Sequence, residues 1–471
     1  MNLSAFAFVL SMVASASAVV YNSNEAGTNA LKELVFKTRV YMPYGPDLTT
    51  DPPQPSDQVW EGFGFGMGAA EHAAYDHVEG YLYVQSEEGP YISVTDWSST
   101  GATLTAYSLD LSKYDSELKD VVACPEQGYL FIAATDADLI LQYSTVKRAK
   151  PGLPELIREI DAGKVPDNLR PSDDCAFLAV ANENDGEAFA EGAVHIVSGF
   201  ESNAGPTVRR VSLAGFDDDY LLANKVAMPL SLKAMEYWDD FSDIADDLNL
   251  GAMRANYKPS YFFMPEYMKF SSNNKKLYVN LQDNSALVQI DTETGQALRI
   301  DGYGLKSYSG IGVDIVEDDG CSEYVSSEYL YAMRLPDAID VLEKDGVTYV
   351  FTADEGTDFD FDDYEEKYDA GDIFDGGALN LKGFTAPSAF FNPLNPQTSP
   401  TARFNNECEN YNLGRECLSG VGITVGSMAV DYSNPQAPVM DKLVLFGGRG
   451  ISAYRVPEVG PIEFIWDSVS L

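Results

Sequence analysis

The sequence predicts an all-β fold, a β-propeller built from about seven four-stranded antiparallel blades. Short apolar stretches of strand length recur along most of the chain, and residues typical of turns separate them. Within residues 265–300, four such stretches follow one another without interruption. A four-stranded unit that repeats along a chain is typical of a propeller, because radial packing of the blades covers the sheet edges.

The unit at 265–300 shows the order expected within a blade. Its four strands are separated by turns rich in Asn, Asp, Ser and Gly, which are residues that tolerate tight backbone turns. We expect the same order in further units, which begin at Ala70, Cys124, Ser172, Leu335 and Gly426. Strand-like sequence also occurs outside these units, at 33–36 and 464–466.

Two insertions interrupt the repeat. Residues 217–258 have a partly helical pattern, and residues 384–420, rich in Pro and Asn, are expected to form a long loop. Residues 1–18 form an apolar run that ends in small residues, as in a secretory signal peptide. We therefore expect a secreted chain with a single propeller domain over residues 19–471 and no transmembrane segment.

Cysteine usage agrees with an oxidising compartment. The chain has five cysteines, so at least one stays unpaired. Cys408 and Cys417, in a polar stretch, are one candidate disulfide, and Cys124 and Cys175 could bridge successive repeats. Cys321 would then be free.

The charge of the chain limits its partners. The formal net charge is −42, which argues against nucleic acid and anionic membrane surfaces because both need Lys and Arg. Such self-repulsion favours calcium-rich or saline surroundings and cationic partners.

Acidic side chains are densest after a strand pattern at 347–352. Eleven acids occur between Asp354 and Asp375, and Asp358, Asp360 and Asp362 alternate as in a calcium-binding loop. Asp363 stands where an EF-hand needs glycine. We expect a looser calcium-binding loop, and the alternative is a solvated acidic loop.

Acids also recur at equivalent points of the repeat. One set is expected to open the innermost strands: Glu71, Glu126, Asp173, Glu266 and Asp337. A second set follows the second strands and includes Asp136, Asp138, Glu183, Asp283, Asp354 and Glu355. Both sets should converge on one rim of the central channel, where their oxygens suit calcium better than a transition metal. The alternative is that each acid caps a turn.

These two patterns give one set of candidate metal ligands and no candidate catalytic residue. The predicted calcium ligands are Glu71, Glu266, Asp337, Asp354, Glu355, Asp358, Asp360 and Asp362.

Several blocks resemble the choice-of-anchor I family, which includes mesenchyme-specific cell-surface glycoprotein-like proteins. The similar blocks lie at 265–286, 313–320 and 335–356, and the resemblance runs from about Gly66 to Trp466. Here Gly356 is followed by Thr-Asp-Phe, whereas the family usually continues Asp-Ala-Arg. The resemblance implies an extracellular or cell-surface propeller, usually without an assigned reaction, although some bacterial members are labelled alkaline phosphatase.

We therefore expect a secreted, acidic, calcium-stabilised propeller that acts as an extracellular binding or matrix protein. Its expected partner is an extracellular protein, a glycan or a mineral surface. The alternative is a calcium-dependent phosphoric-ester hydrolase, in which bound calcium would attract an anionic substrate.

Overall fold

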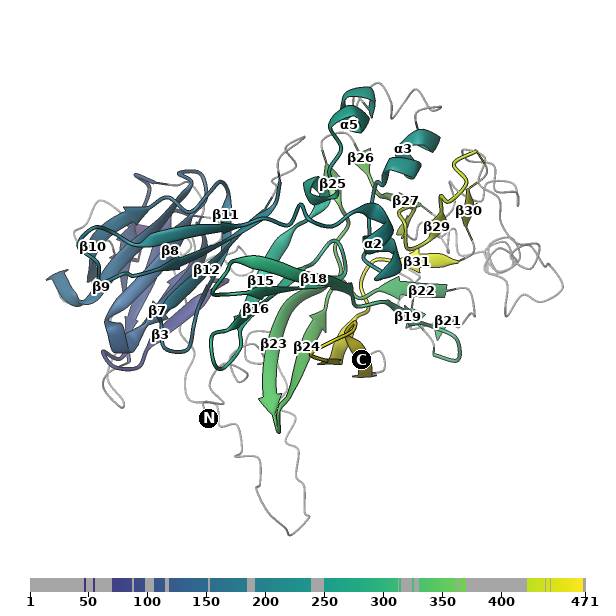
Figure 1. Ribbon diagram of the computed structural model, residues 1–471. Coiled ribbons are helices and arrows are strands. Elements are labelled where there is room, and N and C mark those ends of the chain that lie inside the picture. The colour runs from purple at the N-terminus through teal and green to yellow at the C-terminus, as the bar shows by residue number, and fades with distance from the viewer. Residues whose placement is uncertain are drawn as a thin grey trace, which may run out of the picture. The chain divides into compact units, whose positions relative to one another are not determined.

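The computed structural model describes residues in 16 ranges: 46–47, 54–55, 70–86, 89–97, 106–114, 118–150, 153–183, 191–238, 250–311, 313–314, 324–325, 330–361, 364–369, 422–436, 438–440 and 442–468. All of them belong to the unit that spans residues 42–471. Figure 1 labels its strands and helices.

Four consecutive antiparallel sheets of four strands confirm the predicted blades. Blade I contains β3 (Ala73–Asp76), β4 (Tyr81–Gln85), β5 (Tyr91–Asp96) and β6 (Ala106–Asp110). Blade II contains β7 (Leu118–Cys124), β8 (Tyr129–Ala134), β9 (Leu139–Lys150) and β10 (Leu153–Ile160). Blade III contains β11 (Pro166–Pro171), β12 (Phe177–Asn182), β13 (Ala193–Ser198) and β14 (Thr207–Val211). Blade IV contains β15 (Pro265–Phe270), β16 (Lys276–Leu281), β17 (Ala286–Asp291) and β18 (Gln296–Gly302).

Blade V is assembled from two distant parts of the chain. It contains β23 (Pro336–Lys344), β24 (Val347–Asp354), β32 (Gly450–Val456) and β33 (Glu463–Asp467). The prediction of a separate unit beginning at Gly426 is therefore wrong, because β32 pairs with β24 while Leu443–Leu445 joins another sheet. An apolar strand pattern alone does not identify the sheet that a strand enters.

That other sheet has five strands, namely β19 (Leu305–Ser307), β22 (Leu330–Met333), β31 (Leu443–Leu445), β28 (Gly422–Thr424) and β27 (Lys367–Asp369). β22 and β31 pair in parallel and lie side by side in Figure 1. Four short ladders complete the described strands: β1 (Pro46–Asp47) with β2 (Gln54–Pro55), β20 (Val313–Asp314) with β21 (Tyr324–Val325), β25 (Asp360–Phe361) with β26 (Tyr364–Glu365), and β29 (Val430–Asp431) with β30 (Val439–Met440).

The hydrophobic cores lie between successive blades. Tyr83 of blade I clusters with Ile132 of blade II, and Phe131 of blade II clusters with Leu178 of blade III. β3 contacts β7, β7 contacts β11, β11 contacts β15, and β15 contacts β23. Alternate side chains of a strand point to opposite faces, so blades II, III and IV, which take part in clusters with the blade on either side, are buried on both faces, as propeller packing requires.

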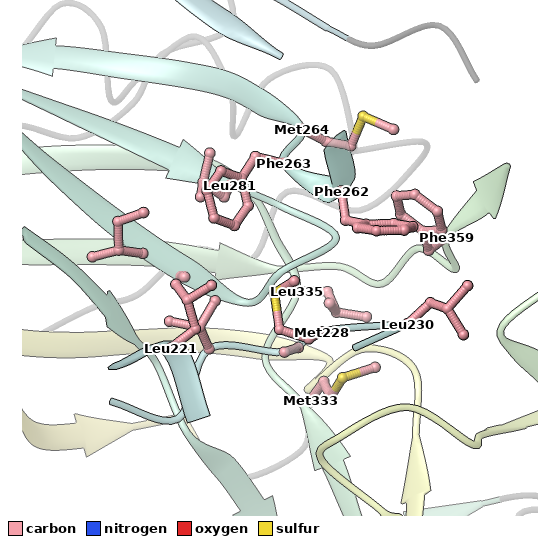
Figure 2. Close-up of a cluster of buried hydrophobic side chains, with 14 of the residues drawn as sticks. Leu221, Met228, Leu230, Phe262, Phe263, Met264, Leu281, Met333, Leu335 and Phe359 are labelled. Atoms are coloured by element: carbon pink, nitrogen blue, oxygen red, sulfur yellow. The ribbon is translucent and has the colours of Figure 1, made fainter. Parts of the chain in front are cut away.

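The insertion at 217–258 contains helices, as predicted: α2 (Asp218–Ala223), α3 (Leu232–Trp238) and α5 (Leu250–Asn256). Asp217 caps α2 by accepting a hydrogen bond from the Tyr220 backbone N–H at 2.8 Å. Leu221 of α2 belongs to the same buried cluster as Phe262 of the 3₁₀ helix η2 (Pro259–Phe262), Met333 and Leu335, all of which are labelled in Figure 2. The insertion therefore joins blade IV to the five-stranded sheet.

The predicted disulfide between Cys124 and Cys175 is present, with the two Cα atoms 5.9 Å apart. It ties the end of β7 to the turn after β11, and so ties blade II to blade III. The signal segment, Cys321, the Cys408–Cys417 pair and the insertion at 384–420 lie outside the described residues. Among the described helices, none is long and apolar enough to cross a membrane.

Candidate functional site

The innermost strands of blades II to V share a bulge near their first residues. Their pairing with the second strand breaks between Leu118 and Asp120, Pro166 and Asn168, Pro265 and Met268, and Pro336 and Ala338. The displaced residues are Lys119, Asp167, Glu266 with Tyr267, and Asp337. Proline cannot donate to the ladder, and a bulge redirects the side chain that follows it. Three blades therefore present a redirected acid at the same end of the innermost strand.

Blade I brings two residues to the corresponding place. The backbone N–H of Glu71 donates to the Gln85 carbonyl at 3.2 Å, and the Gln85 N–H donates to the His72 carbonyl at 2.9 Å. The Gln85 side chain also donates to the Glu71 carboxylate at 3.3 Å. Glu71 and His72 thus stand immediately before β3, side by side with the bulge of blade II.

His72 is the centre of a hydrogen-bond chain that links four blades. Its Nδ1 lies 2.9 Å from Asp120 Oδ1 in β7, and its Nε2 lies 3.2 Å from the Tyr267 hydroxyl in β15. The second carboxylate oxygen of Asp120 accepts from the Leu169 backbone N–H in β11 at 2.8 Å. Blades I, II, III and IV are therefore connected through one imidazole and one carboxylate.

The acids around His72 keep its imidazole protonated. Burial lowers its pKa, but the Asp120 carboxylate, followed by Glu71 and Asp167, raises the pKa to about 9. At neutral pH the imidazolium therefore donates to both Asp120 and Tyr267. This cation partly neutralises the surrounding acids.

Two predicted metal ligands, Glu71 and Asp337, interact electrostatically with this imidazolium, and a third, Glu355, interacts with Asp337. Burial, followed by the charges of Glu355 and Glu71, raises the pKa of Asp337 to about 6, while His72 lowers it. Glu71 and Glu355 are exposed, and Asp337 is half-buried. Glu71, Asp337 and Glu355 therefore share one electrostatic environment.

Glu266, the fourth predicted ligand of the rim, gathers with two other acids. One carboxylate oxygen from each of Asp167, Glu183 and Glu266 lies within 4.8 Å of the others. Burial and then the charges of Glu183, Asp167 and Asp337 raise the pKa of Glu266 to about 10. Burial also raises the pKa of Asp167, to about 6. Carboxylates this close repel one another unless a proton or a cation lies between them.

Asp358 forms a further acidic cluster with Asp283 and Glu366. Burial raises the pKa of Asp283 to about 7 and that of Glu366 to about 8, and the charge of Asp358 contributes to both. Glu366 accepts a hydrogen bond from the Thr424 hydroxyl. Asp358 pairs through both carboxylate oxygens with the Lys367 ammonium, each at 2.6 Å.

Asp354 stands in a separate network of hydrogen bonds. Its carboxylate accepts from the hydroxyls of Thr352, at 2.6 Å, and Ser452, and one oxygen lies 3.5 Å from the Arg334 guanidinium. The side chains of Asp360 and Asp362 lie outside the described part of the structure. The six predicted ligands whose side chains are described are thus distributed over the rim, the acids around Asp358 and the hydrogen-bond network of Arg334.

Two members of the predicted rim are wrong, and two residues were missed. Glu126 lies in the 3₁₀ helix η1 (Pro125–Gln127) after β7, and Asp173 lies in the turn after β11. The innermost strands start earlier than the repeat suggested, so Asp120 and Asp167 occupy the rim instead. A proline followed by an acid, present at 166–167, 265–266 and 336–337, is the sequence signal that would have identified this position in three blades.

The arrangement offers oxygen ligands to a divalent cation. The rim contains carboxylates from blades I, III, IV and V, and oxygen-rich sites of this kind suit calcium. The residues therefore fit the predicted cofactor by the chemistry of their donor atoms.

Comparison with known proteins gives a family and distant structural likenesses. The model of the choice-of-anchor I domain matches residues 71–470. A search of curated proteins finds no match. Hydrazine synthase of Kuenenia stuttgartiensis is similar with a TM-score of 0.35 and 11% identity, over 61% of this chain and 57% of that chain.

Two further structures show comparable likeness. The Cps50 (Swd1) β-propeller domain of Myceliophteria thermophila has a TM-score of 0.33 and 10% identity, over 60% of this chain and 65% of that chain. A putative 6-phosphogluconolactonase of Bacteroides uniformis has a TM-score of 0.30 and 13% identity, over 49% of this chain and 52% of that chain. The matches span less than two thirds of each of the three structures. None of them is close enough to assign a function to this chain.

Proposed function

The chain belongs to the choice-of-anchor I domain family, and we propose that it is an extracellular or cell-surface binding propeller stabilised by calcium. The observation that carries the proposal is the convergence of Glu71, Asp167, Glu266 and Asp337 on one end of the innermost strands. These acids come from four blades, so a cation bound among them would hold separate sheets together.

Electrostatics supports the calcium part of the proposal. The elevated pKa values of Glu266, Asp167 and Asp337 mean that ionising all three acids is costly without a counter-charge. A divalent cation removes that cost. Extracellular modules bind calcium at about 0.1–1 mM, which is compatible with partly exposed acids of this kind.

The Cys124–Cys175 disulfide and the net charge of −42 support the extracellular part. Disulfides persist in oxidising compartments, and a strongly acidic surface in the presence of calcium suits cationic or calcium-bridged partners. We propose an extracellular protein, a glycan or a mineral surface as the partner. Adsorption to calcium carbonate would identify the mineral, and glycan arrays would identify a sugar.

Thermal melting with and without calcium tests the proposal. Melting of the full chain in about 2 mM calcium should occur several degrees higher than in chelator. Magnesium should have a smaller effect, because it requires tighter octahedral geometry. Sodium chloride of equal ionic strength is the control for screening. Equal melting temperatures in calcium, sodium chloride and chelator would contradict the proposal.

One observation favours the second candidate, a calcium-dependent phosphoric-ester hydrolase. Lys119 occupies in blade II the bulge position that an acid occupies in blades III to V, and it lies close enough to Asp167 to lower that acid's pKa. A cation beside bound calcium could hold a phosphoryl group. Turnover of p-nitrophenyl phosphate that needs calcium and falls in Lys119→Ala would support this activity.

A further inference from the structure

We propose that Asp167, Asn168, Glu183 and Glu266 form a calcium site that joins blade III to blade IV. The site deepens the proposed function, because it rests on calcium as the stabilising ion and assigns that ion a position between two blades. Two of its residues follow the proline of an innermost strand, one continues β11, and one follows β12.

The spacing of the carboxylates matches the size of the ion. One oxygen each from Asp167, Glu183 and Glu266 lies within 4.8 Å of the others. Calcium binds oxygens at about 2.3–2.6 Å, so two ligands on opposite sides of one ion are at most about 5 Å apart. The three oxygens are therefore near enough to contact a common ion without rearrangement of the strands.

Asn168 provides an observation independent of the acids. This residue is 2% exposed, and its Oδ1 has no hydrogen-bond partner. Buried amide oxygens without a donor are rare, because desolvating them costs about 1–3 kcal/mol. A cation beside Oδ1 would supply the missing partner, and amide oxygens are ordinary calcium ligands.

The strand register places Asn168 on the same face as the acids. Asn168 lies opposite Ala181 in the ladder, and Ala181 packs in the cluster that contains Val279 and Leu281 of blade IV. The next residue, Leu169, packs on the other face with residues of blade II. Glu183 follows Ala181 by two residues, which returns it to the face of Asn168. Both side chains therefore lie on the side of blade III that meets blade IV.

A glycine holds the two blades close at this point. A Cβ added to Gly192, in the connection before β13, would lie 2.1 Å from the Phe263 carbonyl oxygen and 2.8 Å from Pro265 Cδ. Only glycine allows the backbone of blade III to approach the start of β15 so closely. Pro265 directly precedes Glu266, so this contact fixes the Glu266 side of the site relative to blade III.

The site takes in the rim acids of blades III and IV, whereas the rim acids of blades I and V lie with His72. The Asp120 carboxylate and the Tyr267 hydroxyl are hydrogen-bonded to His72, whereas one carboxylate oxygen from each of Asp167, Glu183 and Glu266 lies within 4.8 Å of the others. Glu71, Asp337 and Glu355 belong to the His72 environment. Substitutions can therefore separate the two positions.

Calcium titration of the full chain by calorimetry, with melting curves in calcium and chelator, tests the site. Asn168→Ala keeps every charge and removes the side-chain amide with its oxygen, and we expect it to weaken calcium binding roughly tenfold. The double variant Asp167→Asn with Glu183→Gln should lose the calcium-dependent rise in melting temperature. In chelator it should melt no lower than the wild type, which shows that it folds.

Asp173→Asn, an exposed acid of the same blade, is the matched control and should bind calcium as the wild type does. Retention of wild-type affinity in both Asn168→Ala and the double variant would overturn the inter-blade site. If the calcium effect is instead lost in Asp337→Asn and kept in the double variant, the ion binds on the side of the rim formed by blades I and V, and the proposed function survives without this site. A wild type without any calcium response would overturn both.

Discussion

At the scale of single residues, a protonated histidine among acids organises the rim. His72 is bonded to Asp120 and Tyr267, so one imidazolium contacts blades II and IV from blade I. Asp120 in turn receives the Leu169 N–H, which leaves both of its oxygens bonded. A charge that is paired and hydrogen-bonded on both sides stabilises the fold, and removing one partner leaves the other uncompensated.

Asp120→Asn tests this pair. The pKa of His72 is about 9 in the folded chain and 6.5 in a free imidazole, so its stabilisation is complete below pH 6.5 and lost as pH rises to 9. In Asp120→Asn we expect a lower His72 pKa and a loss of about 2–3 kcal/mol at pH 6, which declines towards pH 9. Urea unfolding over this pH range, with NMR titration of His72, measures both effects. A stability loss that is equal at pH 6 and pH 9 would contradict the pairing.

Glu366 lowers the stability of the folded chain as pH rises, whereas the paired His72 stabilises it. Its buried carboxyl has a pKa of about 8, against 4.5 when unfolded, so the unfolded chain ionises first and stability falls as pH rises from 4.5 to 8. Glu366→Gln should therefore leave stability at pH 4.5 almost unchanged and raise it at pH 8 by on the order of 3 kcal/mol. Urea unfolding in chelator measures this difference.

Glu458→Gln is the matched control for Glu366→Gln, because it makes the same chemical change at an exposed position. An equal effect of the two substitutions at pH 8 would show that Glu366 is not destabilised by burial.

The sequence located acids at the rim but misplaced some of them by several residues. Glu71, Glu266, Asp337 and Glu355 were predictable because they flank clear strand patterns. The positions of Asp120 and Asp167 were not predictable. The polar pair Lys119-Asp120 interrupts the apolar pattern at the start of β7, and a bulge has no simple periodicity. Asn168 could not be recognised either, since its missing hydrogen-bond partner is a property of the folded chain.

At the scale of elements, blade V depends on a polar network that fastens its last two strands. Arg334 donates to the Ser452 hydroxyl in β32 and to the Asp467 carboxylate in β33, both at 2.6 Å, and its guanidinium lies 4.5 Å from the centre of the Phe464 ring. Asp354 at the end of β24 lies 3.5 Å from the same guanidinium. One side chain thus holds strands that come from distant parts of the sequence.

Arg334→Ala should destabilise blade V, because it leaves two acids of low exposure without their cation. We expect a loss of about 3–5 kcal/mol by urea unfolding, together with faster hydrogen exchange in β32 and β33. Arg455→Ala removes an exposed pair with Glu463 and should cost less than about 1 kcal/mol. Similar costs for the two substitutions would contradict the role of the network.

Blades I to IV were predictable because each is continuous in sequence, with alternating apolar residues and turn signals. Blade V was not, because its two halves are separated by the acidic run and by β27, β28 and β31, which enter another sheet. Long-range pairing between short strands depends on which edges are available in the folded chain. No local pattern encodes that choice.

At the scale of the whole molecule, the chain has a large excess of acids and buries several of them next to one another. The chain has 73 acidic and 31 basic side chains, and its blades direct several of the acids to places where they are partly buried together. Folding without a counter-ion would force some of these acids to stay protonated. Calcium would bind them in the ionised form and release protons, so its affinity should increase with pH.

Metal analysis of the purified chain tests the central claim most directly. In equilibrium dialysis against about 5 mM calcium with excess sodium chloride, elemental analysis should find at least one more calcium ion per chain inside than in the outer buffer, and none after treatment with chelator. The variant with Asp167→Asn and Glu183→Gln should hold fewer ions than the wild type. A wild-type chain that holds no more calcium than the outer buffer would contradict the account.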